Sequence, residues 1–381
     1  MSPSDVEAYA RALVRCPSVT PASAGSLELI ARWLRPLGFD IHHLRFGPAG
    51  EEVENLYARL GDAPPVLAFC GHVDVVPAED AARWRHPPFA AAVEEGILYG
   101  RGAADMKGAI AAFLAALEAF LQGGRPRGSL ALLLTADEEG AAVHGTRALL
   151  HWLEQRGERL DFALVGEPTC ERRLGDAVKI GRRGSLTARL RAQGQSGHVA
   201  YPDQACNAAH ALVRLLGTLI EEPLDAGSEH FAPSTLQIVR LAADGGAVNR
   251  VPGAAEAVFN VRFNDRHRAG SLVALLEQRL GRSGCPFTLE VLSSSEPFLT
   301  RPGPEVQRLI RAIEDELGSA PVLSTGGGTS DARFLHRHCP VVEFGLVARN
   351  IHGVDEQVPL SELEALSRVY LRFLGSFFGD G

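Results

Sequence analysis

Three short motifs rich in acids and histidine each follow directly on an apolar run that has the length of a buried strand. They read GHVD (71–74), TADEEG (135–140) and VGEPT (165–169). Runs of this kind alternate with helical patterns, such as residues 109–121, and this alternation predicts a mostly parallel α/β sheet. Because ligand sites of open α/β sheets form beyond the carboxyl ends of the strands, we expect the three motifs to meet at one edge.

The middle of the chain has a different pattern. Residues 257, 259, 261 and 263 alternate on one face of an expected strand, which is typical of a half-buried antiparallel sheet. The sequence therefore predicts a smaller α+β domain. We expect its two helices at 207–221 and 271–282, and its strands at 186–192, 235–241, 255–263 and 287–292.

The last part returns to the first pattern. It contains a helical stretch at 305–317, a buried strand at 340–345 and a last helix that is expected to open with the capping box Ser361-x-x-Glu364. Because candidate ligands occur near both ends of the chain, the smaller domain is expected to be an insertion. We place the first part of the catalytic domain at 1–180, the inserted domain at 181–294 and the second part at 295–381.

Composition excludes several classes of function. The chain has 381 residues and a net charge of -8, with acids and bases interspersed, so a nucleic-acid tail or a polybasic membrane patch is not expected. Six cysteines without C-x-x-C spacing argue against a zinc ribbon and fit reduced thiols. With neither a signal-peptide pattern nor an apolar stretch of ~18 residues, we expect a cytoplasmic protein.

Five side chains in these motifs and in a late NIHGVDE (350–356) are candidate metal ligands: His72, Asp105, Glu139, Glu167 and His352. They suffice for two divalent ions and leave Glu138 as a base, which together are the parts of a metal-assisted hydrolase. Asp74 is one candidate for orienting the imidazole of His72.

Each of these residues also has a simpler interpretation when it is taken alone. His72 and His352 could be satisfied histidines of a loop, Asp105 could be a helix N-cap, and the acids 137–139 could form a solvated turn. The glycine-rich loop 326–331 could bind a carboxylate through its N–H groups, but it lacks the Gly-Lys-Ser/Thr of a P-loop. Possible anion clamps that could equally be solvated surface residues are Arg182, Arg183 and Arg262.

Longer stretches resemble the two-zinc aminoacylase/carboxypeptidase family of metallohydrolases. They are FCGHVDVVPAED, GILYGRGAADMKGAIAAF, TADEEG, VGEPT, KIGRRGSLTARLRAQGQSGHVAYP, NRVPG, FNVRFN and GGTSDARF. The resemblance covers residues 6–373 and implies a zinc aminopeptidase-like catalytic domain with an inserted dimerisation and lid domain. It further implies two zinc ions per subunit, replaceable by cobalt, with His72 and Glu167 on one ion, Glu139 and His352 on the other, and Asp105 bridging.

The resemblance also implies roles in catalysis. Glu138 would be the general base and acid, Asp74 would orient His72, and His198 would reach the active site of the other subunit of a homodimer. The peptide bond between Asp105 and Met106 would be cis. Residues that match the family's substrate contacts are Lys179, Arg182, Ser185, Tyr201, Asn249, Arg262, Gly328 and Thr329.

The substrate implied by the resemblance is a small acylated diamino acid whose amide is hydrolysed. The chain departs from the family near this substrate: it reads VARNIHG where close members read VNATIHK, which places Ala348 and Gly353 at altered positions, and TGGGTSD where TTGGTSD is usual. Acetylornithine deacetylase, another N-acylamino-acid hydrolase and a dipeptidase are alternatives within the family. A non-catalytic metal or peptide binder is a further alternative, against which the intact Glu138 argues.

Overall fold

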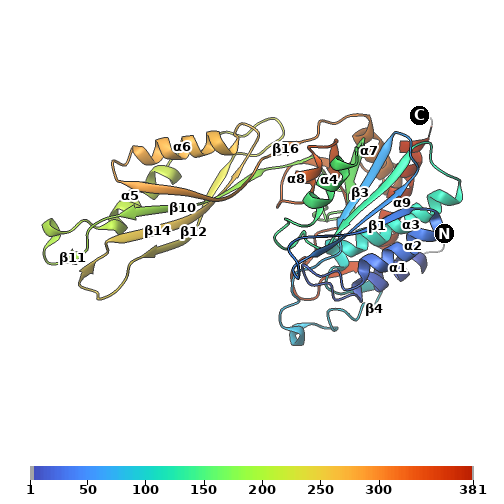
Figure 1. Ribbon diagram of the computed structural model, residues 1–381, viewed down its shortest axis with the longest axis horizontal. Coiled ribbons are helices and arrows are strands. Elements are labelled where there is room, and N and C mark those ends of the chain that lie inside the picture. The colour runs from blue at the N-terminus through green and yellow to red at the C-terminus, as the bar shows by residue number, and fades with distance from the viewer. Residues whose placement is uncertain (1–3, 380–381) are drawn as a thin grey trace. The chain divides into compact units, whose positions relative to one another are not determined.

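The computed structural model describes residues 4–379, which divide into two compact units (Figure 1). The larger unit comprises the described residues up to Ile180, together with Thr300–Ser324 and the residues from Thr329 onward. The smaller unit comprises Gly181–Leu299 and Thr325–Gly328. It extends beyond 294 because β16 (Phe298–Leu299) pairs with β9 (Gly181–Arg182).

The larger unit is built on an eight-stranded sheet within the described residues, in the order β1-β2-β6-β3-β7-β18-β8-β17. The four central strands are parallel, and all residues of β3, β6 and β7 are buried, which explains their continuous apolar runs. The bounds are β1 Asp40–Phe46, β2 Val53–Leu60, β3 Val66–His72, β6 Ser129–Thr135, β7 Phe162–Val165, β8 Ala177–Lys179, β17 Val322–Ser324 and β18 Val341–Glu343.

Helices pack against this sheet. The ring of Phe69 in β3 stacks on Phe113 of α3 at 4.0 Å between centroids, and both rings meet Tyr370 of α9 edge-on. The helices of the larger unit are α1 Ser4–Val14, α2 Ser26–Leu34, α3 Gly108–Gln122, α4 Thr146–Gln155, α7 Pro304–Leu317, α8 Ala332–Leu335 and α9 Leu360–Phe378. Short elements complete it: η1 Arg35–Leu37, η2 Ala81–Arg83, η3 Ala103–Lys107, and a small sheet of β4 Ala92–Glu94, β5 Ile97–Tyr99 and β19 Gln357–Pro359.

One helix start differs from the prediction. The last helix begins at Leu360, directly after β19, and Pro359 occupies the N-cap position without a side-chain cap. Ser361 therefore lies inside the first turn and the predicted capping box is wrong. The reason is tertiary, since the pairing of Gln357–Pro359 with β5 decides where the extended chain ends.

The smaller unit has a four-stranded antiparallel sheet in the order β12-β14-β10-β15. Its core confirms the alternation expected from the sequence, because Ala257, Phe259, Val261 and Phe263 are all fully buried beneath the two helices. The elements are β10 Gly184–Gln193, β11 Gly197–His198, η4 Pro202–Gln204, α5 Ala208–Ile220, β12 Thr235–Ala243, β13 Arg250–Val251, β14 Ala254–Phe263, α6 Ala269–Gly281 and β15 Phe287–Ser295.

The predicted α/β class with a separate antiparallel sheet is thus confirmed. None of the helices between residues 4 and 379 is long and apolar enough to span a membrane.

Candidate metal centre

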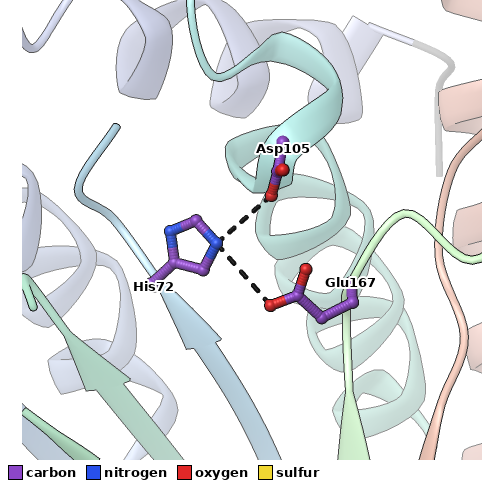
Figure 2. Close-up of side chains that lie close together, drawn as sticks. All are labelled: His72, Asp105 and Glu167. Carbon is purple, nitrogen blue, oxygen red and sulfur yellow. Dashed lines mark hydrogen bonds and ion pairs between the residues drawn. The ribbon is translucent and has the colours of Figure 1, made fainter. Parts of the chain in front are cut away.

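One group of possible ligands lies at the carboxyl edge of the larger sheet (Figure 2). His72 is the last residue of β3, Glu167 follows β7, and Asp105 lies in η3 just before α3. His72 Nε2 lies 3.2 Å from Asp105 Oδ1 and 3.7 Å from Glu167 Oε1. Because β3 and β7 are parallel neighbours, their ends bring an imidazole and a carboxylate to the same point.

A second group shares Asp105 with the first. His352 Nε2 lies 2.9 Å from Glu139 Oε1 and 3.4 Å from Asp105 Oδ2. In each group the candidate ligand atoms lie within 4.8 Å of one another. The two oxygens of the Asp105 carboxylate therefore face two separate groups of candidate ligands. The peptide bond from Asp105 to Met106 is cis, as the resemblance implied.

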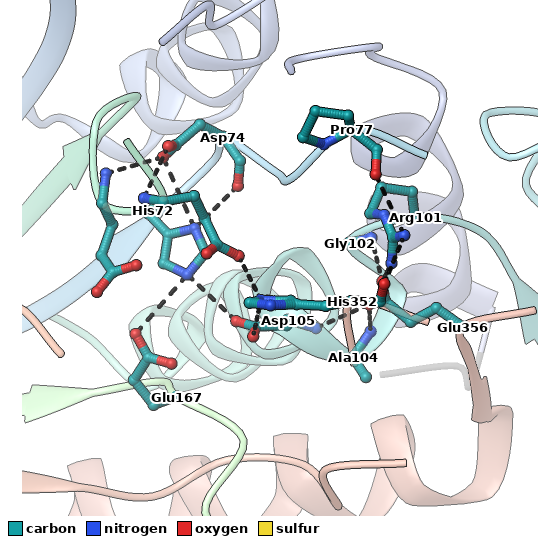
Figure 3. A network of polar contacts seen from close by, with 12 residues as sticks. His72, Asp74, Pro77, Arg101, Gly102, Ala104, Asp105, Glu167, His352 and Glu356 are labelled. Atoms are coloured by element: carbon teal, nitrogen blue, oxygen red, sulfur yellow. Dashed lines mark hydrogen bonds and ion pairs between the residues drawn. The ribbon is translucent and has the colours of Figure 1, made fainter. Parts of the chain in front are cut away.

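Asp74 contacts this site in a way that the sequence did not reveal (Figure 3). His72 Nδ1 lies 2.9 Å from the main-chain oxygen of Asp74, whereas the carboxylate of Asp74 is 3.7 Å away. Since a carbonyl oxygen only accepts, Nδ1 carries a hydrogen, and Nε2 faces the acids. The carboxylate of Asp74 instead accepts the backbone N–H groups of Glu138 and Glu139, at 3.3 and 3.1 Å.

The three consecutive acids differ in what they contact. The carboxylate of Asp137 accepts the backbone N–H groups of Ala142, Val143 and His144, so it shapes the turn after β6. The carboxylate of Glu139 contacts His352. Glu138 lies between Asp137 and Glu139 in the sequence, and its backbone N–H donates to the carboxylate of Asp74. The solvated-turn interpretation therefore fails for this stretch, since Asp137 is 3% exposed.

The acids of the site crowd one another at low exposure. Burial raises the pKa of Glu167 well above its usual range, and the charge of Asp105 adds to that rise while His72 opposes it. Burial likewise raises the pKa of Glu138 to about 8, with the charge of His72 opposing and that of Asp331 adding. A cation bound beside Glu138 and Glu167 would favour their ionised forms.

The pKa values of the two histidines are raised as well, which favours their charged forms. Burial alone would lower the pKa of His72, but its hydrogen bond with Asp105 and the charge of Glu167 raise it well above the usual value. Hydrogen bonds with Asp105 and Glu139 raise the pKa of His352 to about 10. The neighbouring carboxylates thus favour the charged form of both imidazoles.

The predicted substrate contacts fall into small groups within each unit. In the smaller unit, Asn249 Nδ2 lies 3.4 Å from His198 Nε2, and the rings of His198 and Tyr201 are 5.8 Å apart. Ser185 and Arg262 are paired across β10 and β14. Arg182 Nη1 donates to the carbonyls of Gly326 and Gly328 of the glycine-rich loop, at 3.3 and 3.2 Å.

Two predicted contacts belong to the larger unit. Lys179 Nζ donates to Ser324 Oγ at 3.2 Å and lies 3.7 Å from Glu171. Thr329 is half-buried at the start of the segment that returns to the larger unit. Two further buried residues, Arg101 and Glu356, contact the candidate ligands and were missed, although both stand inside the quoted motifs GRGAADMKG and NIHGVDE.

The class of protein follows from comparison with known families. Residues 68–376 match the model of peptidase family M20/M25/M40, and the chain belongs to this family. The chain is 50% identical over 391 residues to a succinyl-diaminopimelate desuccinylase of Rhodospirillum rubrum, covering 98% of this chain and 99% of the relative. It is also 50% identical over 380 residues to the enzyme of that name from Rhodospirillum centenum, covering 99% and 98%. The resemblance stated from the motifs is thereby confirmed.

Solved structures show the same fold at low identity. Aminopeptidase PepT from Bacillus cereus superposes with a TM-score of 0.80 at 17% identity, covering 99% of each chain. An M20 family metallo-carboxypeptidase from Sulfolobus solfataricus has a TM-score of 0.76 at 17% identity, covering 97% of this chain and 98% of its own. The YXEP protein of Bacillus subtilis, described as a dinuclear metal binding peptidase, has a TM-score of 0.68 at 15% identity, covering 99% and 98%.

Proposed function

We propose that this chain is a metal-dependent amide hydrolase that removes succinate from N-succinyl-L,L-2,6-diaminopimelate and releases L,L-diaminopimelate, a precursor of lysine and of the cell wall. The observation that carries this proposal is the identity of about half of all residues, over nearly the whole length, to relatives named for that reaction. The site supports the reaction class independently, since it combines two donor groups with an adjacent spare acid.

The donor atoms fit a pair of zinc ions, which cobalt could replace. Each group offers one imidazole nitrogen and two carboxylates, a nitrogen and oxygen set that zinc accepts. His72 and Glu167 would hold one ion and Glu139 and His352 the other, with Asp105 between them. When bound, such a pair activates water for attack and polarises the amide carbonyl.

Glu138 would act as the general base and acid. It stands next to the proposed ligand Glu139, and its raised pKa suits a group that takes a proton from water and passes it to the leaving amine. The carboxylate of Asp74 holds the backbone of both glutamates, while its carbonyl orients His72. Asp74 would therefore position base, ligand and imidazole together.

The smaller unit would serve as the dimerisation and lid domain of a homodimer. Its outer strand β12 carries Val239 and Leu241 at 63% and 62% exposure, which suits an edge that pairs with a second subunit. His198, exposed beside Asn249, would stabilise the oxyanion in the partner's site. Arg182, Arg262 and the glycine-rich loop would hold the carboxylates of the substrate. All six cysteines are free, which supports a cytoplasmic location.

The substrate test uses zinc-loaded protein with N-succinyl-L,L-diaminopimelate, and N-acetylornithine in a parallel reaction. Selective release of succinate would support the proposal and show that Ala348 and Gly353 are tolerated near the site. A robust rate on the acetyl substrate together with silence on the succinyl one would discard the substrate while keeping the hydrolase class.

A further inference from the structure

A buried carboxylate outside the proposed ligand set holds the loop that carries the bridging acid. Glu356 is fully buried, and its two oxygens accept four hydrogen bonds (Figure 3). The donors are Arg101 Nη1 at 2.7 Å and the backbone N–H groups of Gly102, Ala104 and Asp105, at 3.0, 2.9 and 3.1 Å. The backbone on which Asp105 stands is therefore fastened by a residue 251 positions away.

The guanidinium of Arg101, which pairs with Glu356, also contacts the backbone of His352. Arg101 is 1% exposed and pairs with Glu356, and its other terminal nitrogen donates to the main-chain oxygen of His352 at 3.1 Å. The same nitrogen reaches the carbonyl of Pro77 at 3.4 Å, and the guanidinium lies 5.1 Å from the ring centre of Trp84. One ion pair thus touches the backbone of both Asp105 and His352.

We propose that the Arg101–Glu356 ion pair is a positioning device that sets the spacing between Asp105 and His352, and so determines the affinity for the second metal ion. The proposal rests on the proposed function, since it takes these two side chains as ligands. The backbone of His352 has a positive φ of 62°, a conformation that a non-glycine residue keeps only where its surroundings hold it. Arg101 supplies one such contact.

The effect should be larger for one ion than for the other. His72 and Glu167 are placed by the paired strands β3 and β7, and neither residue contacts the ion pair through any hydrogen bond in the described part of the chain. Asp105 belongs to both groups, so loss of the ion pair should weaken both ions. The ion held by Glu139 and His352 should be weakened more, because the main-chain oxygen of His352 also loses its contact with Arg101. Residues that orient metal ligands without touching the metal typically change affinity 10–100-fold.

Stepwise zinc affinities of the metal-free, full-length protein, measured by competition with a chelator, test this inference. The variants are Glu356→Gln, which removes the charge and keeps the shape, and Arg101→Lys, which keeps the charge and loses the planar fork. Glu362→Gln is the matched control, because Glu362 accepts from Arg349 at 2.7 Å, three residues before His352, without bonding either ligand. Visible absorption of the cobalt-loaded proteins reports the geometry of each ion without relying on turnover.

We expect both variants to bind the ion of Glu139 and His352 10–100-fold more weakly and the other ion with a smaller loss. The control should bind both ions normally. Normal binding of both ions by either folded variant, or an equal loss of both ions, would overturn the positioning role. If Glu356→Gln does not fold, as judged by circular dichroism, Arg101→Lys decides the question. A wild type that binds fewer than two ions would instead refute the proposed function, and this inference with it.

Discussion

Binding of zinc to the metal-free protein should expel a proton from His352. Hydrogen bonds with Asp105 and Glu139 raise the pKa of His352 to about 10, so the imidazole is charged near neutral pH. A histidine must be neutral to ligate a metal, so the ion and the proton compete for Nε2. Affinity for this ion should therefore rise as pH rises toward the pKa.

The magnitude follows from the competition. Each pH unit below the pKa changes the fraction of neutral imidazole, and hence the apparent affinity, about tenfold. A histidine with an unperturbed pKa of about 6.5 would show almost no such slope above neutrality. The side chain of His352 is 48% exposed, so solvent screens its contacts and limits the rise in its pKa. We therefore expect the affinity for this ion to depend on pH mainly between about pH 6.5 and 8.

The assay is chelator competition across that range, with calorimetry in buffers of different ionisation heats to count the released protons. His352→Gln provides the comparison, since it removes the titrating group and leaves the other ligands in place. The wild type should release about one more proton than this variant. Equal proton release by the two proteins, or an affinity for the second ion that stays constant across the range, would refute the reasoning.

Three further predictions concern the proposed base Glu138, His198 of the smaller unit, and the stability that Asp225 gives to the smaller unit. Glu138→Gln should lower turnover ~10²–10⁴-fold without loss of zinc, and a rate near that of the wild type would end its role as base. His198→Ala should also lower turnover at unchanged zinc content; an unaffected rate would exclude His198 from the reaction. Burial alone would raise the pKa of Asp225, but hydrogen bonds from Ser234, Gly227 and Asn264 lower it to about 2. The stability from Asp225 should thus be full above its usual pKa of 3.8 and fade as pH falls toward about 2. Asp225→Asn should lower the free energy of unfolding by about 2 kcal/mol at neutral pH and flatten its acid dependence in urea titrations; Glu290→Gln, in an exposed pair with Arg189, should do neither.

The sequence by itself determined the main strands and the strand ends at which the candidate ligands lie. The apolar runs that became β3, β6 and β7 were visible because strands buried on both faces need continuous apolar residues. The alternation in β14 was equally local, since one face of that strand meets α5 and α6. Motifs placed directly after such runs therefore indicated where a site would form, and which acids and histidines would line it.

The tertiary structure alone decided which polar groups serve the site and which serve the backbone. Within one run of three acids, Asp137 turns to the N–H groups of its own loop, whereas Glu139 meets a histidine 213 residues away. The contact between Arg101 and Glu356 spans 255 residues, and no local spacing encodes it. Apolar periodicity is written along the chain because each element buries its own face, but a buried charge needs its partner in space, and only the packed fold brings that partner near.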